Sequence, residues 1–176
     1  MGDTAAGFRC HSGWTVMVVM AGTGRHPVLV ARQRLELTGP GLPRQPYHAV
    51  AEQGAPSSVI AEVAAAARRA AAAALASASG LAAVGLVAAQ RSLPDDLDAI
   101  LRSHARLHAA EGRLYEVAVM DAASDLGLAV HLVDPGAIRV GPEVDALRQS
   151  AGAPWQKDHK WAACAALGAL EMAPGP

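Results

Sequence analysis

The stretch Gly7-Phe8-Arg9-Cys10-His11-Ser12-Gly13-Trp14 leads directly into the apolar segment 15–20. A glycine-rich turn that leads into a strand often marks a functional site. This turn would bring the side chains of residues 9–12 close together. It is therefore either a functional loop, the remnant of one, or only a turn.

Length and charge limit the classes of protein to consider. A chain of 176 residues fits one ordinary domain, which we expect to span 1–176 with a flexible tail at 171–176. The net charge of -1 gives no electrostatic reason for tight, nonspecific phosphate binding. The sequence leaves a nucleic-acid partner open but supports it weakly, and it also leaves homo-oligomerisation open.

Cysteine usage and hydropathy indicate the compartment. Cys10 and Cys164 lie at opposite ends of the chain without a CxxC motif, so the sequence predicts neither a disulfide scaffold nor a structural zinc site of cysteines. The longest apolar tract, 59–89, contains Glu62 and Arg68, which makes it a poor membrane span. We therefore expect a soluble, cytoplasmic protein with no membrane partner.

Hydrophobic periodicity and Gly/Pro breaks predict an α/β protein. Three leading strands joined by hairpins would be antiparallel, and later strands separated by helices would be parallel. A mixed five-stranded sheet flanked by helices follows, with a break of the long helix near Gly112 left open. The expected strands are 14–20, 27–38, 47–52, 81–89 and 128–133, of which the last two would be buried on both faces. The expected helices are 59–79, 94–126, 142–150 and 157–170.

The order of elements resembles the ribonuclease H-like superfamily, especially its RuvC-type Holliday-junction resolvase branch. The stretch 7–14 is similar to the signature of that branch's first strand, in which an aspartate precedes a small-residue turn and then Gly-Trp or Gly-Tyr. The resemblance implies that the first strand begins before Trp14 and turns at 11–13. The segment 158–166 also resembles the family's last helix, which is Asp-rich and then Ala-rich.

The resemblance also identifies what this chain lacks. The family cuts nucleic acid with two metal ions held by carboxylates from the first strand, the end of the fourth strand and the last helix. Here Arg9 fills the position of the first aspartate, Gln90 ends the segment matched to the fourth strand, and Trp161 stands where a second aspartate is common. Only Asp158 matches, and one carboxylate cannot hold two cations that repel each other. We therefore predict that the standard two-metal mechanism is absent.

Three polar residues of the long predicted helix form a second candidate site. His104, His108 and Glu111 are spaced four and three residues apart and share one stripe of that helix. This pattern can chelate a transition metal, so these three are the candidate ligands of a divalent ion. A His and Glu pair can alternatively supply an acid and a base. A half-buried helix edge explains the same spacing without any ligand.

In the fold implied by the resemblance, the last helix begins near the turn of the first strand. His11, Asp158 and Glu111 would then meet, and His11, His108, Glu111 and Asp158 are the catalytic candidates of a relocated site. Two hypotheses follow. The first is a non-catalytic or regulatory binding module of ribonuclease H-like fold, and the alternative is a metal-assisted phosphodiester hydrolase with that relocated site.

Overall fold

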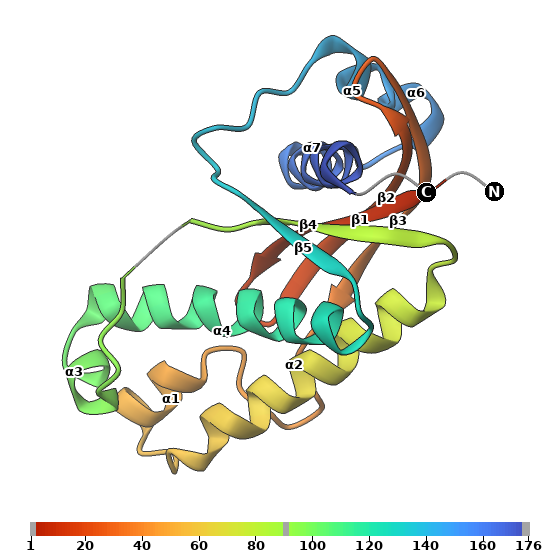
Figure 1. The fold of residues 1–176 in the computed structure, drawn as a ribbon. Coiled ribbons are helices and arrows are strands. Elements are labelled where there is room, and N and C mark those ends of the chain that lie inside the picture. Colours follow the sequence, from red (N-terminus) through yellow and green to blue (C-terminus); the bar gives the residue numbers. More distant parts are fainter. Residues whose placement is uncertain (1–2, 90–91, 174–176) are drawn as a thin grey trace.

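A five-stranded sheet forms the centre of the molecule (Figure 1). The structure, a computed structural model, describes residues 3–89 and 92–173. The strands are β1 Thr4–His11, β2 Trp14–Thr23, β3 His26–Glu36, β4 Leu81–Val87 and β5 Ala129–Val133. Their order is β3-β2-β1-β4-β5, with β1, β2 and β3 antiparallel and with β4 and β5 parallel to β1. This arrangement confirms the predicted mixed sheet.

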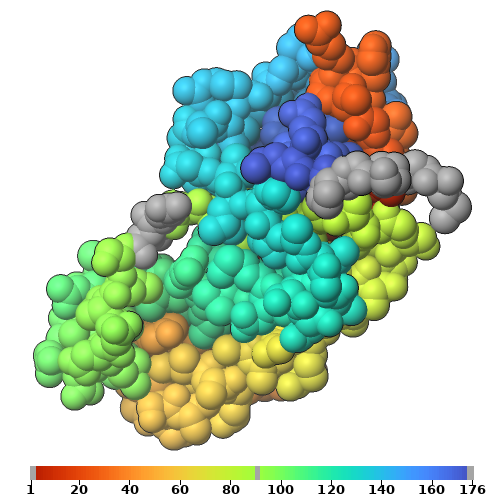
Figure 2. Space-filling model, in the orientation of Figure 1, coloured from red at the N-terminus to blue at the C-terminus, as the bar shows by residue number. Residues whose placement is uncertain are grey.

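Helices cover both faces of the sheet. They are α1 Pro46–Gln53, α2 Ser58–Ser77, α3 Leu97–Leu101, α4 His104–Asp125, α5 Pro142–Ala146, α6 Arg148–Ala151 and α7 Lys157–Met172. α7 crosses one face against β1, β2 and β4, and α2 and α4 lie on the other face (Figure 1). Figure 2 shows the dark-blue surface of α7 between the orange β2–β3 hairpin and the light-blue segment that follows β5.

The alternation of β1 divides its side chains between these two layers, because successive residues of a strand point to opposite faces. Ala6, Phe8 and Cys10 are buried in the core with α2 and α4, whereas Ala5 is buried in the core with α7. The odd-numbered residues of this strand therefore face α7. The last two of them are Arg9 and His11, which places both side chains toward the last helix.

Backbone contact fixes α7 against the centre of the sheet. A Cβ atom on Gly7 would overlap the carbonyl oxygen of Ala162, and one on Gly85 would overlap that of Ala165. The two glycines are neighbours in register on β1 and β4, so α7 lies directly on a surface that has no side chains there. This close approach holds the start of α7 beside the end of β1.

The turn between β1 and β2 lies where the resemblance implies. His11 pairs with Trp14, and Gly13 between them has a φ of 84°, a left-handed conformation that glycine adopts without strain. β1 begins at Thr4, well before Trp14. The expected start and turn of the first strand are therefore confirmed.

Segment 47–52 was predicted to be a strand, and this prediction is wrong. The segment belongs to α1, in which Pro46 occupies the first turn and Gly54 ends the helix with a φ of 70°. Proline suits a first helical turn because its φ is already helical and its missing N–H has no partner there anyway. A short apolar run does not distinguish a strand from a helix, and here the burial of His48 and Ala49 against α4 decides for the helix.

The later elements differ from the predictions in three places. The predicted helix 94–126 is broken at Arg102 and Ser103 rather than near Gly112, because the backbone of Ser103 is extended and separates α3 from α4. The predicted helix 142–150 consists of the two short helices α5 and α6. β5 is an edge strand with partly exposed side chains, so the expected burial of 128–133 on both faces is wrong.

The last helix is longer than expected. It continues to Met172, so the first two residues of the expected tail 171–176 are helical, and 174–176 lie outside the described residues. Within the described parts of the chain, none of the helices combines the length and the apolar character needed to cross a bilayer.

Candidate functional site

His11 and Asp158 meet at the end of β1 and the start of α7. His11 Nε2 and Asp158 Oδ2 are 2.9 Å apart, and the two side chains are 31% and 29% exposed. The His11 ring also stacks on Trp14, with ring centroids 4.1 Å apart. Asp158 lies in the first turn of α7, where the helix dipole favours a negative charge. The structure therefore brings together these two of the four catalytic candidates.

Two cations lie on the indole of Trp161 beside this pair. Arg9 Cζ is 5.6 Å from the ring centroid, and Lys157 Nζ is 4.2 Å from it, both within the range of cation–π attraction. Arg9 Nε is buried and has no hydrogen-bond partner among the described residues. We call Arg9, His11, Lys157, Asp158 and Trp161 the β1–α7 site. Its cations favour an anion and oppose a divalent metal ion.

A shallow groove of about 420 Å³ adjoins the β1–α7 site. One of its lysines, Lys160, forms an ion pair with Asp145, whereas the other, Lys157, contacts the indole of Trp161. The groove is lined by Val140, Gly141, Pro142, Asp145, Lys157, Lys160 and Trp161. A groove of this kind accommodates a small anionic group next to an aromatic face.

Glu111 does not join His11 and Asp158, so the expectation that these three residues meet is wrong. Its Oε1 accepts hydrogen bonds from the backbone N–H of His48, at 3.1 Å, and from His48 Nδ1, at 3.2 Å. Glu111 is only 1% exposed. Burial raises the pKa of Glu111 above its ordinary value, and the hydrogen bonds from His48 oppose that shift. Glu111 and His48 join α4 to α1, on the other side of the sheet from α7.

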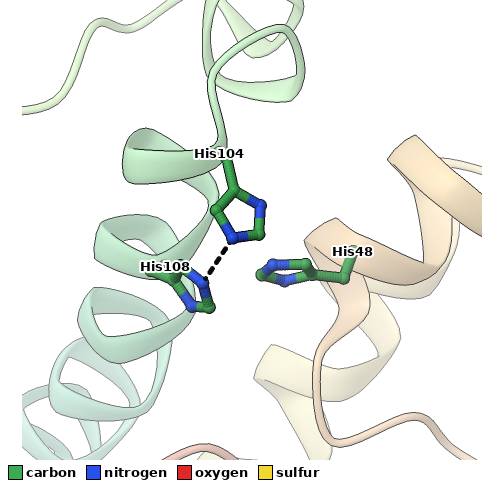
Figure 3. Close-up of side chains that lie close together, drawn as sticks. All are labelled: His48, His104 and His108. Carbon is green, nitrogen blue, oxygen red and sulfur yellow. Dashed lines mark hydrogen bonds between the residues drawn. The ribbon is translucent and has the colours of Figure 1, made fainter.

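Three imidazoles converge where α1 meets the start of α4 (Figure 3). His104 and His108 come from the first turns of α4, and His48 approaches from α1. One ring nitrogen of each residue lies within 4.8 Å of the others, and His104 Nε2 and His108 Nε2 are 3.0 Å apart. We call these residues the three-histidine cluster. His48 is buried, and the other two are exposed.

The three predicted metal ligands therefore have two different roles in the geometry. His104 and His108 lie in the cluster, as their i, i+4 spacing suggests. Glu111 lies outside the cluster and contacts Nδ1 of His48. Sequence reasoning missed His48, because it lies far from α4 in the chain and in a segment predicted to be a strand. The proline at position 46, a typical helix start, was the available signal for α1.

Cys10 is not a reactive nucleophile. It is buried between the sheet and α4, with its Sγ 3.5 Å from Thr15 Oγ1 and 3.9 Å from the carbonyl oxygen of Tyr115. Burial raises the pKa of the Cys10 thiol to about 12, and the hydrogen bond with Thr15 opposes this shift only partly. The thiolate that nucleophilic chemistry needs is therefore scarce near neutral pH.

Comparisons with known proteins agree with this geometry at the level of fold. No family model matches the sequence, and no curated protein matches it. Two similar solved structures are those of Thermus thermophilus RuvC, one of them described as a complex with a Holliday junction substrate. The complex has 16% identity and a TM-score of 0.58 over 94% of this chain and 90% of that chain. The other structure has 17% identity and a TM-score of 0.57 over 93% and 90%. The chain therefore has a RuvC-like fold of the ribonuclease H type.

Proposed function

We propose that this protein is a nucleic-acid-binding module that uses a RuvC-like fold without the two-metal nuclease centre. The observation that carries this proposal is Arg9, which packs with Lys157 on Trp161 where the resemblance matches the family's first carboxylate. The chain keeps the RuvC-like fold, but position 9 carries a positive charge where the resemblance places a negatively charged aspartate.

Electrostatics argue against two metal ions in the β1–α7 site. Two cations a few ångströms apart need several carboxylates to offset their repulsion. Asp158 is the one carboxylate of this site, and it is already engaged by His11. The guanidinium of Arg9 adds a positive charge on the same side of the sheet, and position 90, outside the described residues, holds glutamine rather than an acid. Binding without cleavage follows from this arrangement.

The same charges suit a phosphate backbone. Arginine and lysine supply the contacts to phosphate oxygens, and an accessible indole offers a face on which a base can stack. Arg9, Lys157 and Trp161 combine these groups within one small surface next to the groove. The RuvC structure bound to a Holliday junction makes branched DNA the first ligand to test. A module that binds such a ligand without cutting it would act by holding or shielding it, which is a regulatory role.

The relocated hydrolase is not supported by the geometry. His11 and Asp158 lie between β1 and α7, whereas His108 and Glu111 lie on α4, beyond the other face of the sheet (Figure 1). The four side chains therefore do not line a common pocket.

Fluorescence anisotropy with a labelled four-way DNA junction, a duplex and a single strand tests the binding. We expect Arg9→Ala and Lys157→Ala each to weaken junction binding and to reduce the slope of log K against log salt by about 1, because one phosphate contact is lost. Arg69→Ala is the matched control, since Arg69 is an exposed arginine of α2 on the other side of the sheet. No binding by the wild-type protein, or equal losses in all three variants, would contradict the proposal.

Incubation of the same junction with Mg²⁺ or Mn²⁺ tests the absence of cleavage. We expect intact strands on a denaturing gel, even when the protein is in excess over the junction. Cleavage by the wild-type protein that disappears in Asp158→Asn would overturn the non-catalytic part of the proposal while leaving the binding part in place.

A further inference from the structure

The three-histidine cluster is not explained by nucleic-acid binding at the β1–α7 site. It lies on the opposite side of the sheet, and it joins α1 to the start of α4 (Figure 1). Its three imidazoles point toward one another rather than away into solvent (Figure 3). Ring contacts and the hydrogen bond between His104 Nε2 and His108 Nε2 account for part of this convergence, but they leave the buried Nε2 of His48 without a partner among the described residues.

His48 is held in a fixed orientation and tautomer by its neighbour. Its Nδ1 lies 3.2 Å from Glu111 Oε1, the oxygen that also accepts from the backbone N–H of His48, so this oxygen acts as the acceptor and Nδ1 as the donor. Its Nε2 therefore carries a lone pair, and this atom is buried without a hydrogen-bond partner among the described residues. A buried, unsatisfied acceptor costs free energy comparable to a lost hydrogen bond. A metal ion would satisfy it.

One distance within the cluster is close to that between two ligand atoms of a small cation, and the other nitrogen pairs are near enough to approach it. Two ligands at 2.0–2.1 Å from a tetrahedral ion are roughly 3.3 Å apart. The Nε2 atoms of His104 and His108 are 3.0 Å apart, and the ligand nitrogens of the cluster all lie within 4.8 Å of one another. Small rotations of the two exposed imidazoles would close the remaining gap, since the His104 side chain is 71% exposed.

We propose that His48, His104 and His108 bind a divalent transition-metal ion, with Zn²⁺ as the expected ion and Glu111 as the residue that positions His48. Three neutral imidazoles suit Zn²⁺ and disfavour Mg²⁺ and Ca²⁺, which prefer oxygen ligands. A carboxylate that accepts from the second nitrogen of a metal-binding histidine is the usual supporting contact in such sites. Because His104 and His108 are exposed, the fourth coordination position faces solvent and is available to water or another ligand.

The ion would connect two segments that are far apart in the chain. α1 is a short helix, and the described contacts that hold it to α4 include the hydrogen bonds of Glu111 with His48. Metal binding to the folded state alone adds stability by mass action. The site is therefore expected to raise the melting temperature in the presence of Zn²⁺.

Metal titration of the full chain after treatment with a chelator tests the proposal. We expect one Zn²⁺ per chain by isothermal titration calorimetry, and a visible absorption spectrum of four-coordinate Co²⁺ when cobalt replaces zinc. His104→Asn and His108→Asn remove exposed ligands, so they leave the fold intact while abolishing the tight site. His26→Asn is the matched control, because His26 is an exposed histidine at the start of β3.

Glu111 variants distinguish a positioning role from a structural one. Glu111→Gln retains an oxygen that accepts from His48 Nδ1, so we expect a loss of Zn²⁺ affinity at the small end of the 10–100-fold range for supporting residues. Glu111→Leu removes the acceptor and should lose more, with a changed Co²⁺ spectrum. Absence of stoichiometric Zn²⁺ binding by the wild-type chain, or binding that survives in both His104→Asn and His108→Asn, would overturn the assignment.

Discussion

The β1–α7 site leaves a buried donor, Arg9 Nε, without a partner among the described residues, whereas the three-histidine cluster leaves a buried acceptor, His48 Nε2, without one. His11 is paired with Asp158, and both cations of the site contact Trp161. His48 Nε2 has no partner among the described residues. The first site therefore has an unpaired donor and two positive charges to offer an anion. The second has a lone pair to offer a cation.

The two sites also depend on different kinds of packing. The β1–α7 site is positioned by backbone contact, because α7 lies directly on Gly7 and Gly85. The three-histidine cluster is positioned by side chains, through the hydrogen bonds of Glu111 with His48. Substitutions that affect only one kind of packing can therefore perturb one site and leave the other unchanged.

Gly7→Ala should have the largest effect on stability. A methyl group there meets the backbone of Ala162, which cannot move without shifting α7, so we expect a loss of roughly 3 kcal/mol in the free energy of unfolding. Urea denaturation measures it. Gly168→Ala is the matched control in α7, where nothing lies within 4 Å of the added methyl, and should stabilise by up to about 1 kcal/mol. Equal stabilities of the two variants would contradict the backbone contact.

Glu111→Ala should have the next largest effect. Without metal, the backbone N–H and Nδ1 of His48 lose their buried acceptor, and we expect a loss of about 2 kcal/mol in the free energy of unfolding. Denaturation in the presence of a chelator measures this contribution separately from that of any ion. Glu111→Gln should recover part of the loss, because the amide oxygen still accepts. Wild-type stability in Glu111→Ala would show that α1 does not depend on this contact.

Most of the sheet could be predicted from the sequence, because alternation in 27–38 and the apolar runs around β2 and β4 are strong local signals. Segment 47–52 could not be predicted, since a short apolar run fits a strand or a helix and only burial against α4 decides between them. The break between α3 and α4 lies at the extended residue Ser103, and a helical pattern that continues on both sides does not reveal it.

The two sites were predictable to different degrees. His11 and Asp158 were expected to meet because the resemblance places the end of the first strand beside the last helix, and the structure places them 2.9 Å apart. His104 and His108 share a helix face by their spacing. No local pattern joins them to His48, because the contact depends on how α1 packs against α4. The contact of His48 with His104 and His108 depends on long-range packing, which local patterns in one sequence do not predict.

Arg9→Asp reverses the charge on which the proposed binding depends. We expect junction affinity to fall by roughly tenfold, because a phosphate contact is replaced by repulsion. We expect no cleavage in Mg²⁺, since position 90 still lacks a carboxylate. Zn²⁺ binding should be unchanged, because the three-histidine cluster lies on the other side of the sheet. Anisotropy, a cleavage assay and metal titration measure these three outcomes, and a gain of cleavage would contradict our account of the missing carboxylates.

His159→Gln should have the smallest effect, and it concerns the pH at which the start of α7 is stable. His159 Nδ1 accepts from the backbone N–H of Gln156, 3.3 Å away, which requires the neutral ring. Burial lowers the pKa of His159 below its ordinary value of 6.5, and the charge of Arg32 lowers it further, whereas Asp158 opposes the shift. Below about pH 6.5 the unfolded chain therefore binds more protons than the folded one.

The sign of the pH dependence follows from this difference. The contribution of His159 to stability is fully present above the unfolded pKa and decreases as the pH falls through 6.5 toward the lower folded pKa. In His159→Gln the glutamine oxygen can accept the same N–H without titrating, as glutamine does in a capping box. We therefore expect thermal melts at pH 7.5 to agree, and melts at pH 5.5 to favour the variant slightly. If the melting temperatures of the wild-type protein and the variant changed equally with pH, protonation of His159 would not weaken this cap.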